Sequence, residues 1–228
     1  MKKCILIASF VLVLFSCKKE EQKGVALLDA NDFTTLIDEK NVSLYTLESE
    51  SGIYMQVTNL GGRVVTLWTP DRKGNYEDIV LGYENIDKYI NNEGQALHGE
   101  LNDLDQVVWD VDKICKDEIK FSYLSLEMTY ALTPDNELKI VYKATTDKPT
   151  VISLPHHGLF NLKGKGTITD YITPITEVPI FTDEIKHATT LYEPTNGRVM
   201  EVWSNFPSTR LNPGEIYAQT CIYKFSTK

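Results

Sequence analysis

The sequence predicts an all-β protein, an antiparallel β-sandwich or barrel, because three features recur along it. Apolar and polar residues alternate with a period of two in several runs, as they do in strands that have one buried face. Clusters of Gly, Pro, Asn and Asp separate these runs, and such residues favour tight turns. Helical periodicity is scarce, and no segment resembles a crossover helix between parallel strands. The strand edges then have to be closed or covered, as in a sandwich or barrel.

Residues 1–16 are typical of an export signal. Lys2 and Lys3 precede the apolar run Cys4–Phe15, which is too short to cross a bilayer as a helix. The sequence Leu14-Phe15-Ser16-Cys17 resembles a bacterial lipobox, and this resemblance implies cleavage before Cys17 and lipid attachment to its sulfur. We therefore expect an exported protein that is lipid-anchored in the bacterial cell envelope. The alternatives are an uncleaved membrane anchor and a cysteine placed there by chance.

Residues 17–24 are predicted to be a solvated tether, because the charged stretch 18–23 has too few apolar groups to pack. Residues 25–228 are then expected to form one domain, since a chain of this length suffices for one core but is short for two. Cleavage would remove two lysines and change the formal charge from −9 to −11. A chain with this negative charge repels the phosphate backbone of nucleic acids. The sequence also has no basic run with interleaved aromatic residues, and we therefore expect no nucleic-acid binding.

The strand alternation is clearest in residues 53–58, 138–144 and 217–225. Five clusters mark turns between predicted strands: residues 59–62, 70–75, 133–136, 194–197 and 212–214. In one of them, Asn196-Gly197 is flanked by strand residues, which predicts a hairpin turn of type I′. The best helical candidate is Glu84–Ile90, and residues 32–36 form a weaker one.

Two cysteines remain in the mature chain, because Cys4 leaves with the signal and Cys17 carries the lipid. Cys221 lies in an alternating run, so we interpret it as a small buried hydrophobe rather than as half of a disulfide with Cys115. No spacing among Cys, His, Asp and Glu matches a closed zinc site, so no metal is expected.

Three of the four histidines lie in two short stretches. One is Leu97-His98-Gly99, and the other is the segment Leu154–Leu162, which contains His156 and His157. A side chain that titrates near neutral pH is costly to bury without a use, so this concentration suggests proton chemistry. If the second segment is extended, neighbouring side chains point to opposite faces, and His156 and His157 do not both line one cleft. The alternative is a pair of structural loop histidines bonded to the backbone.

An ordered set of stretches resembles the aldose 1-epimerase, or galactose mutarotase, family. It comprises residues 59–67, 70–71, 78–83, 97–99, 107–109, 129–162, 205–209 and 211–215, and so touches nearly all of the mature chain. The resemblance implies a galactose mutarotase-like antiparallel β-sandwich, here reduced in strand number, whose concave face holds a free aldohexose such as galactose or glucose. It also implies interconversion of the α and β anomers without a cofactor. In that chemistry a base removes the proton of the anomeric hydroxyl while an acid protonates the ring oxygen.

The resemblance also assigns roles to two histidines. His157 occupies the position of the family's general acid, in a motif usually written Asn-His-x-x-Phe-Asn-Leu. Here His156 replaces the usual Asn, and Gly158-Leu159 replaces the more usual Ser-Tyr. His98 matches the second family histidine, which contacts the sugar near its ring oxygen. Glu100 follows in a place where the family often has a glycine.

Three pieces of the family pattern are missing from this chain. A Gly-Arg-Tyr-Ala-Asn-Arg segment with a sugar-binding arginine is absent before Gly94, and a stretch with a substrate-binding aspartate is absent after Pro179. The piece that holds the catalytic glutamate base is absent between Ser204 and Asn205. Glu201 lies close by, but it matches a strand position in the family, and its neighbours suit an exposed strand face. The general base is therefore unassigned.

The missing base leaves three functions open. The chain is an epimerase with a substitute carboxylate, or a non-catalytic carbohydrate-binding lipoprotein, or else either an inactive shortened family member or a surface protein that pairs an exposed sheet edge with a partner chain. The substitute carboxylates to consider are Glu100, Asp103 and Glu193. The aromatic residues that could stack on a sugar are Trp68, Trp109 and Trp203, although core packing is the commoner role of strand tryptophans. No motif fixes an oligomeric state.

Overall fold

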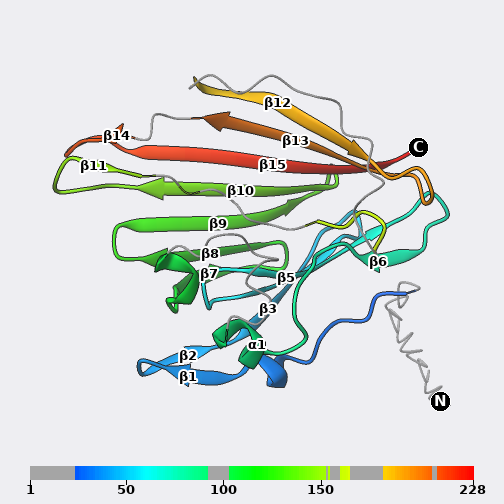
Figure 1. The fold of residues 1–228 in the computed structure, drawn as a ribbon, viewed down its shortest axis with the longest axis horizontal. Helices are drawn as coiled ribbons and strands as arrows, with labels where there is room; N and C mark the ends of the chain where they lie inside the picture. The colour runs from blue at the N-terminus through cyan, green and yellow to red at the C-terminus, as the bar shows by residue number, and fades with distance from the viewer. Residues whose placement is uncertain (1–23, 92–102, 153, 155–159, 165–181, 207–209) are drawn as a thin grey trace, which may run out of the picture.

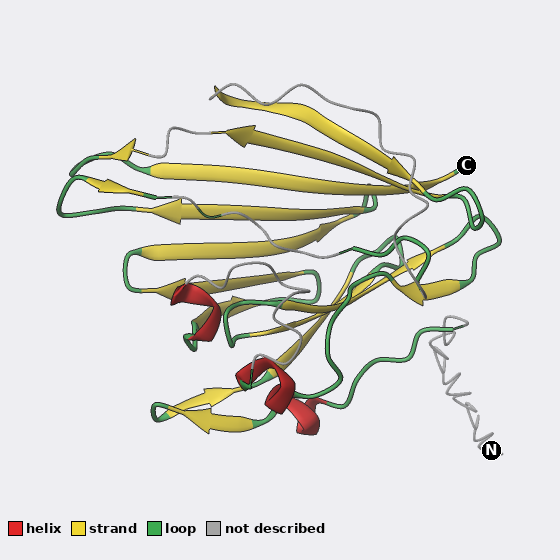
Figure 2. Cartoon of the chain, in the orientation of Figure 1, coloured by secondary structure: helices red, strands yellow, loops and turns green. Residues whose placement is uncertain are grey.

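The computed structural model describes residues 24–91, 103–152, 154, 160–164, 182–206 and 210–228. Strands predominate among them, and the two largest sheets form an antiparallel sandwich (Figures 1 and 2). The helical elements are η1 (Ala30–Phe33), α1 (Ile86–Ile90) and η2 (Asp103–Gln106). The strands are β1 (Thr35–Ile37), β2 (Lys40–Val42), β3 (Leu44–Glu48), β4 (Tyr54–Thr58), β5 (Val64–Pro70), β6 (Tyr76–Asp78), β7 (Asp110–Ile114), β8 (Glu118–Tyr123), β9 (Leu126–Thr133), β10 (Glu137–Ala144), β11 (Thr150–Val151), β12 (Thr182–Tyr192), β13 (Arg198–Phe206), β14 (Arg210–Leu211) and β15 (Tyr217–Thr227).

The larger sheet has seven strands in the order β12-β13-β15-β10-β9-β8-β7, and the smaller has four in the order β3-β4-β5-β6. Two small pairs, β1-β2 and β11-β14, complete the described strands, and every pairing in the four sheets is antiparallel. The antiparallel β-sandwich predicted from alternation and turns is therefore confirmed. The three runs singled out by their alternation are β4, β10 and β15.

The main core lies between the two large sheets, because each presents an apolar face to the other. Register places Ile140 of β10 opposite Tyr130 of β9 on one side and Cys221 of β15 on the other, so these side chains share one face. Met55 and Leu67 on the smaller sheet belong to the same buried cluster and are fully buried. Burial of one such side chain stabilises the fold by about 1.5–3 kcal/mol. We refer to the face of the seven-stranded sheet that contributes to this cluster as the inner face.

A second, smaller core lies under the β1–β2 hairpin and α1, where Phe33, Leu60 and Tyr89 pack together. The buried amide of Asn59 joins this region to the sandwich. Its Oδ1 accepts a hydrogen bond from the N–H of Ser43 at 2.8 Å, and its Nδ2 donates to the carbonyls of Asn41 at 2.9 Å and Trp109 at 3.3 Å. One buried side chain thereby forms hydrogen bonds with three backbone groups from two segments of the chain.

The interpretation of Asn196-Gly197 as a type I′ turn is wrong. That turn needs positive φ at both central residues, and only Gly197 has it, at 80°. The connection from β12 to β13 is instead a five-residue loop, Glu193–Gly197, whose Asn196 side chain bonds to Leu162. The two-residue turn with positive φ at both positions joins β1 to β2 through Asp38 (48°) and Glu39 (63°).

The helical candidates have different outcomes. Within Glu84–Ile90, α1 begins at Ile86 because the Asn85 side chain caps it, accepting a hydrogen bond from the N–H of Lys88 at 3.2 Å. The weaker candidate, residues 32–36, is mostly wrong: the 3₁₀-helix η1 ends at Phe33, and Thr35 begins β1. Pairing with β2 prevails over a short helical pattern at this position.

Cys115 is exposed and Cys221 is buried, and both are free thiols, as the sequence predicted. Within the described ranges, none of the helices has the length and apolar character needed to cross a membrane.

Candidate functional site

The predicted site residues His98, His156, His157 and Cys17 lie outside the described residues, as does Glu100. The described residues on either side of His157 locate the two ends of its segment. Leu154 is buried, and its backbone forms a hydrogen bond with the Tyr217 hydroxyl on β15. Phe160 packs against two other aromatic rings of β15, with centroids 4.9 Å from Tyr223 and 6.4 Å from Phe225. Both ends of the histidine segment therefore contact the same strand.

The contacted residues all lie on the inner face. Tyr217, Tyr223 and Phe225 are separated by even numbers of residues along β15 and are buried, so their side chains share one side of the sheet. Tyr217 and Tyr223 are six residues apart, which corresponds to roughly 20 Å along a strand. The ends of the histidine segment are thus spread along the inner face.

The residues that follow Phe160 are fixed to the smaller sheet. Phe160 forms an isolated β-bridge with Val80, and the N–H of Asn161 donates to the Ile79 carbonyl at 2.7 Å. Asn161 and Leu162 are almost completely buried, at 1% and 0% exposed. The Phe-Asn-Leu part of the motif therefore joins the two sheets at the end of β6.

Polar groups on the inner face accompany these contacts. The Tyr130 hydroxyl donates to the Gly62 carbonyl at 2.7 Å, and the hydroxyls of Tyr130 and Tyr142 are hydrogen-bonded to each other. Burial raises the pKa of Tyr130, Tyr142, Tyr223 and the Cys221 thiol above their ordinary values. All four groups therefore stay protonated at neutral pH, so they offer neutral hydrogen-bonding groups and not a general base.

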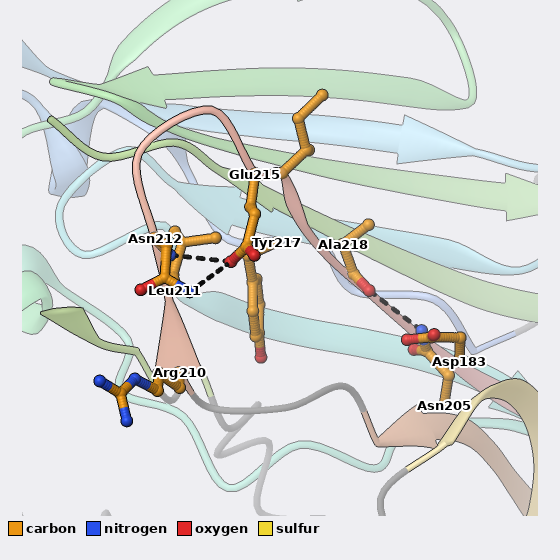
Figure 3. A pocket seen from close by; sticks show the side chains of 9 residues that line it. Asp183, Asn205, Arg210, Leu211, Asn212, Glu215, Tyr217 and Ala218 are labelled. Atoms are coloured by element: carbon orange, nitrogen blue, oxygen red, sulfur yellow. Dashed lines mark hydrogen bonds between the residues drawn. The ribbon is translucent and has the colours of Figure 1, made fainter. Parts of the chain in front are cut away.

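A pocket of about 750 Å³ opens beside Tyr217 (Figure 3). Its lining comes from β12, the end of β13, β14 and the start of β15, and comprises Asp183, Asn205, Arg210, Leu211, Asn212, Glu215, Ile216, Tyr217 and Ala218. In the view of Figure 3 the Tyr217 ring lies between Arg210 on one side and Asp183 with Asn205 on the other. The size suits a small organic ligand.

Two local structures fix the wall of this pocket. The Glu215 carboxylate accepts hydrogen bonds from the N–H of Asn212 at 2.9 Å and from its side-chain amide at 3.1 Å, which closes the turn from β14 to β15 (Figure 3). The Asn205 amide donates to the Ala218 carbonyl at 3.0 Å and accepts from the N–H of Thr220 at 2.6 Å, so it holds the end of β13 against β15. Charged and amide side chains therefore line the pocket, and hydrogen bonds fix the backbone that carries them.

Tyr217 links this pocket to the histidine segment. Its hydroxyl donates to Gln219 at 2.8 Å and also bonds to the Leu154 backbone. Burial is the main cause that raises the Tyr217 pKa, and the Leu154 hydrogen bond acts in the opposite direction. One phenol therefore touches both the pocket and the residue three positions before His157.

Of the carboxylates considered from the sequence, Glu193 and Glu201 have described side chains, and neither lines this pocket. Glu201 alternates with Met200 and Val202, which face the core, and it accepts a hydrogen bond from the Trp203 indole at 3.3 Å on the outer face. Glu193 is buried in the β12–β13 loop, where it accepts from the N–H of Thr195 at 2.9 Å and from its hydroxyl at 2.6 Å. Asp103 is the first residue of η2, and its side chain is not among the described parts of the structure.

The tryptophans do not form a sugar platform in the described structure. Trp109 is buried in the main core and Trp203 lies on the outer face, where its ring centroid is 5.0 Å from that of His187. Trp68 is half-buried on β5 of the smaller sheet. The fourth histidine, His187, bonds to Thr190 on the edge strand β12 and is exposed. Among the described residues no group of three or more potential ligands could hold a metal ion.

The sequence did not predict Asp183 and Arg210 as pocket residues, and Glu215 was included only in the stretch 211–215 that resembles the aldose 1-epimerase family. The available signal was the segment Leu211–Glu215, which combines a tight turn with polar side chains. Asp183 carries no such signal, because it reaches the pocket only through the pairing of β12 with β13.

Comparison with known proteins agrees with this architecture. The family model described as aldose 1-epimerase matches residues 90–205. Galactose mutarotases from Bos taurus and Rattus norvegicus are 24% and 22% identical over alignments of 198 and 209 residues, which cover 63% and 71% of this chain. These alignments cover 57% and 60% of the relatives, so the chain spans somewhat over half the length of the curated proteins that it matches.

Two solved structures have a similar fold. An aldose epimerase homologue from C. elegans superposes with a TM-score of 0.69 at 15% identity, covering 82% of this chain and 99% of that one. A galactose 1-epimerase from Lactobacillus acidophilus superposes with a TM-score of 0.61 at 16% identity, covering 85% of this chain and 97% of that one.

Proposed function

Because this chain belongs to the aldose 1-epimerase family, we propose that it interconverts the α and β anomers of a free aldohexose, galactose or glucose. The observation that carries the proposal is the position of the described ends of the histidine segment. Leu154 and Phe160 both contact the inner face of β15, and Tyr217 at one end also lines the pocket of about 750 Å³. A free sugar in this pocket would lie beside Tyr217, whose hydroxyl bonds to the backbone of Leu154, three positions before His157.

The proposed chemistry needs an acid and a base on opposite sides of one sugar ring. His157 is the proposed general acid for the ring oxygen, and His98 is the proposed second histidine that contacts the sugar there. The ring opens after proton transfer, the aldehyde group rotates, and closure places the hydroxyl on the other face. No cofactor takes part in this scheme.

Asp183 and Glu215 are the described carboxylates that line the pocket, and they are our candidates for the base that the family segment would supply. Asp183 lies on β12 at the pocket rim, and Glu215 lies in the β14–β15 turn. Asp183→Asn and Glu215→Gln preserve side-chain size and remove the charge. The variant that lacks the base should lose activity by about 10²–10⁴-fold and should lose the acidic limb of the pH profile.

Polarimetry tests the main proposal. Pure α-glucose or α-galactose should equilibrate faster with the protein than in buffer alone, and His157→Ala should reduce the catalysed rate by about 10²–10⁴-fold. His187→Ala is the matched control, because His187 is an exposed histidine on the edge strand. Equal rates with and without the wild-type protein would reject the proposal.

A second candidate is a carbohydrate-binding protein without turnover. The observation that favours it is the chemistry of the inner face, where the described tyrosines and Cys221 remain protonated and so provide no base. Calorimetry should then find saturable sugar binding, while polarimetry finds no acceleration. Absence of binding, together with a non-cooperative thermal transition or concentration-dependent association, would indicate an inactive shortened family member instead.

We also propose that the protein is exported and anchored to the cell envelope by lipid on Cys17. The basis is the lipobox-like sequence Leu14–Cys17 that follows a short apolar run. Expression in bacteria with a radiolabelled fatty acid should label the wild-type protein in the membrane fraction. Cys17→Ala should remove both the label and the membrane association, and Cys115→Ala should change neither.

A further inference from the structure

Arg198 is a buried cation whose hydrogen bonds converge on the chain that follows the histidine segment. It begins β13 and is only 2% exposed. Its Nη1 donates to the Leu162 carbonyl at 3.1 Å and to a carboxylate oxygen of Glu77 at 3.3 Å. Its Nη2 donates to the carbonyls of Thr69 at 3.3 Å and Asn75 at 3.1 Å. The two terminal nitrogens therefore join β13 to β5, to the β5–β6 turn, to β6 and to the residue that ends the Phe-Asn-Leu motif.

The Leu162 carbonyl accepts a second hydrogen bond, from the β12–β13 loop that precedes Arg198. The Asn196 side-chain amide donates to it at 2.8 Å, while the Asn196 Oδ1 accepts from the backbone N–H of Arg198 at 3.0 Å. The side chains of Asn196 and Arg198 thus both donate to one carbonyl oxygen, and the Asn196 side chain also holds the Arg198 backbone. We name Asn196, Arg198 and the Leu162 carbonyl the carbonyl clamp.

The clamp holds a short part of the chain, residues 160–162, that other contacts also fix in place. Leu162 is fully buried, the N–H of Asn161 bonds to Ile79, and Phe160 bridges to Val80. These three residues are five, four and three positions after His157. A displacement of the Leu162 carbonyl would move this anchored stretch against the inner face, where Phe160 meets Tyr223.

Arg198 does more than neutralise the charge of Glu77, because most of its acceptors are backbone carbonyls. A buried arginine needs acceptors for its donors, and Arg198 meets three backbone carbonyls and one carboxylate, the partly exposed Glu77. A lysine would keep the charge, but its point-like ammonium lacks the planar fork that reaches these separate acceptors. The arrangement depends on geometry, and Arg198→Lys therefore tests it directly.

We infer that Arg198, with Asn196, is a positioning residue that fixes the backbone of residues 160–162 and thereby the described end of the histidine segment, three to five positions after His157. The effect of Arg198 on catalysis rests on the proposed function. The restraint of residues 160–162 does not, and hydrogen exchange measures it separately.

Arg72 supplies a matched control. It lies in the β5–β6 turn and contacts the β12–β13 loop: its Nη2 donates to the Pro194 carbonyl, and its backbone N–H donates to the Asn196 carbonyl at 3.2 Å. It is exposed, and its described hydrogen bonds go to Pro194 and Asn196 and not to Leu162. Arg72→Met removes an arginine side chain that contacts the β12–β13 loop, and it leaves the clamp intact.

The experiment uses the variants Arg198→Lys, Arg198→Met, Asn196→Ala and Arg72→Met in the mature chain. Amide hydrogen exchange at Asn161 and Leu162 should accelerate by at least about 10-fold in the three clamp variants, because loss of the clamp permits local opening. Exchange at core positions such as Ile140, and the exchange pattern of Arg72→Met, should match the wild type. Unchanged exchange at residues 161 and 162 in variants that stay folded would overturn the inference. If Arg198→Met does not fold, Asn196→Ala carries the test, because it removes one bond to Leu162 and keeps the buried cation.

Polarimetry adds the catalytic readout. Arg198→Lys should lower kcat about 10- to 100-fold with KM changed less than about 3-fold, as expected when a reacting group is displaced by about 1 Å. In a His157→Ala background the Arg198→Lys change should have no further effect, because a residue that acts through His157 has nothing left to position. Additive losses would overturn this role. A wild-type protein without activity would reject the proposed function, and hydrogen exchange would then decide the positioning role alone.

Discussion

Phe160 and Tyr223 pack with their ring centroids 4.9 Å apart and their planes inclined at 53°, which joins the end of the histidine motif to the inner face of β15. Phe160 also lies 6.4 Å from Phe225 by ring centroid. The three rings come from segments that are more than sixty residues apart in the sequence. They form the aromatic contact that fixes one end of the candidate site.

Replacement of Phe160 tests this contact. Phe160→Ala should lower the free energy of unfolding by about 2–3 kcal/mol, below the range for fully buried phenylalanines because Phe160 is only partly buried. It should also reduce the catalysed mutarotation rate. Phe160→Leu, which keeps most of the volume, should lose about 1 kcal/mol. Urea denaturation and polarimetry measure both effects, and an unchanged denaturation midpoint for Phe160→Ala would contradict the packing role.

The Tyr217 hydroxyl is expected to matter more for function than for stability. Tyr217→Phe removes the bonds to Gln219 and to the Leu154 backbone, and it should cost about 1 kcal/mol of unfolding free energy. Sugar turnover or binding should fall by a larger factor, because the hydroxyl connects the pocket to the histidine segment. Tyr54→Phe is the control, since its hydroxyl bonds to Glu48 on the smaller sheet. Equal effects of the two substitutions on turnover would argue against a special role for Tyr217.

Asp78 gives a pH-dependent prediction. Burial raises the pKa of its carboxyl from 3.8 to about 6, against the opposing effect of hydrogen bonds from the N–H groups of Leu67 and Val80. A raised folded-state pKa contributes stability that is fully present below pH 3.8 and is lost as the pH rises through about 6. Asp78→Asn keeps the acceptor oxygen and removes the buried charge. At pH 8 it should therefore be more stable than the wild type, by up to about 3 kcal/mol.

Urea denaturation between pH 5 and pH 8 checks this expectation, with Asp110→Asn as the exposed-carboxylate control. The advantage of Asp78→Asn should shrink steadily as the pH falls through 6. A difference from the wild type that stays constant across this range would show that Asp78 is not the titrating group.

Gly61 should tolerate no side chain. Its φ is +69°, and a Cβ atom would lie 2.4 Å from the Asp105 carbonyl oxygen. Gly61→Ala should therefore lower the free energy of unfolding by roughly 2–4 kcal/mol, through backbone strain and a clash with main chain. Gly74→Ala separates the two causes, because Gly74 has a φ of +78° and no neighbour within 4 Å. It should cost only about 1 kcal/mol, and equal losses in thermal unfolding would contradict the clash.

Much of the fold could be predicted because it depends on local patterns. Alternation identified β4, β10 and β15, and the turn residues around Gly61 and Asn136 marked where strands end. Turn geometry was less predictable. The Asn196 side chain bonds to Leu162 across the structure, so its backbone does not adopt the conformation that the Asn-Gly pair favours in a hairpin. Conversely, Asp38 and Glu39 adopt positive φ without a glycine, because β1 and β2 pair on either side of them.

The candidate site was predictable only where the motif itself carries chemistry. The histidines of residues 97–99 and 154–162 stood out by residue type and concentration, and they remain predictions because they lie outside the described residues. Glu193, by contrast, was a conceivable base that the structure places in a loop, where its carboxylate bonds to Thr195. A carboxylate's sequence position does not reveal which groups surround it after folding.

By itself, the sequence determined the antiparallel β-sandwich, the unpaired state of Cys115 and Cys221, and the concentration of histidines in two stretches, because residue spacing and type act locally. Tertiary structure alone decided that Tyr217 would touch both Leu154 and a pocket, and that Arg198 would bond to Leu162 across thirty-six positions. These contacts join strands that are remote along the chain. They exist only after sheet pairing has fixed the register, and no local propensity encodes them.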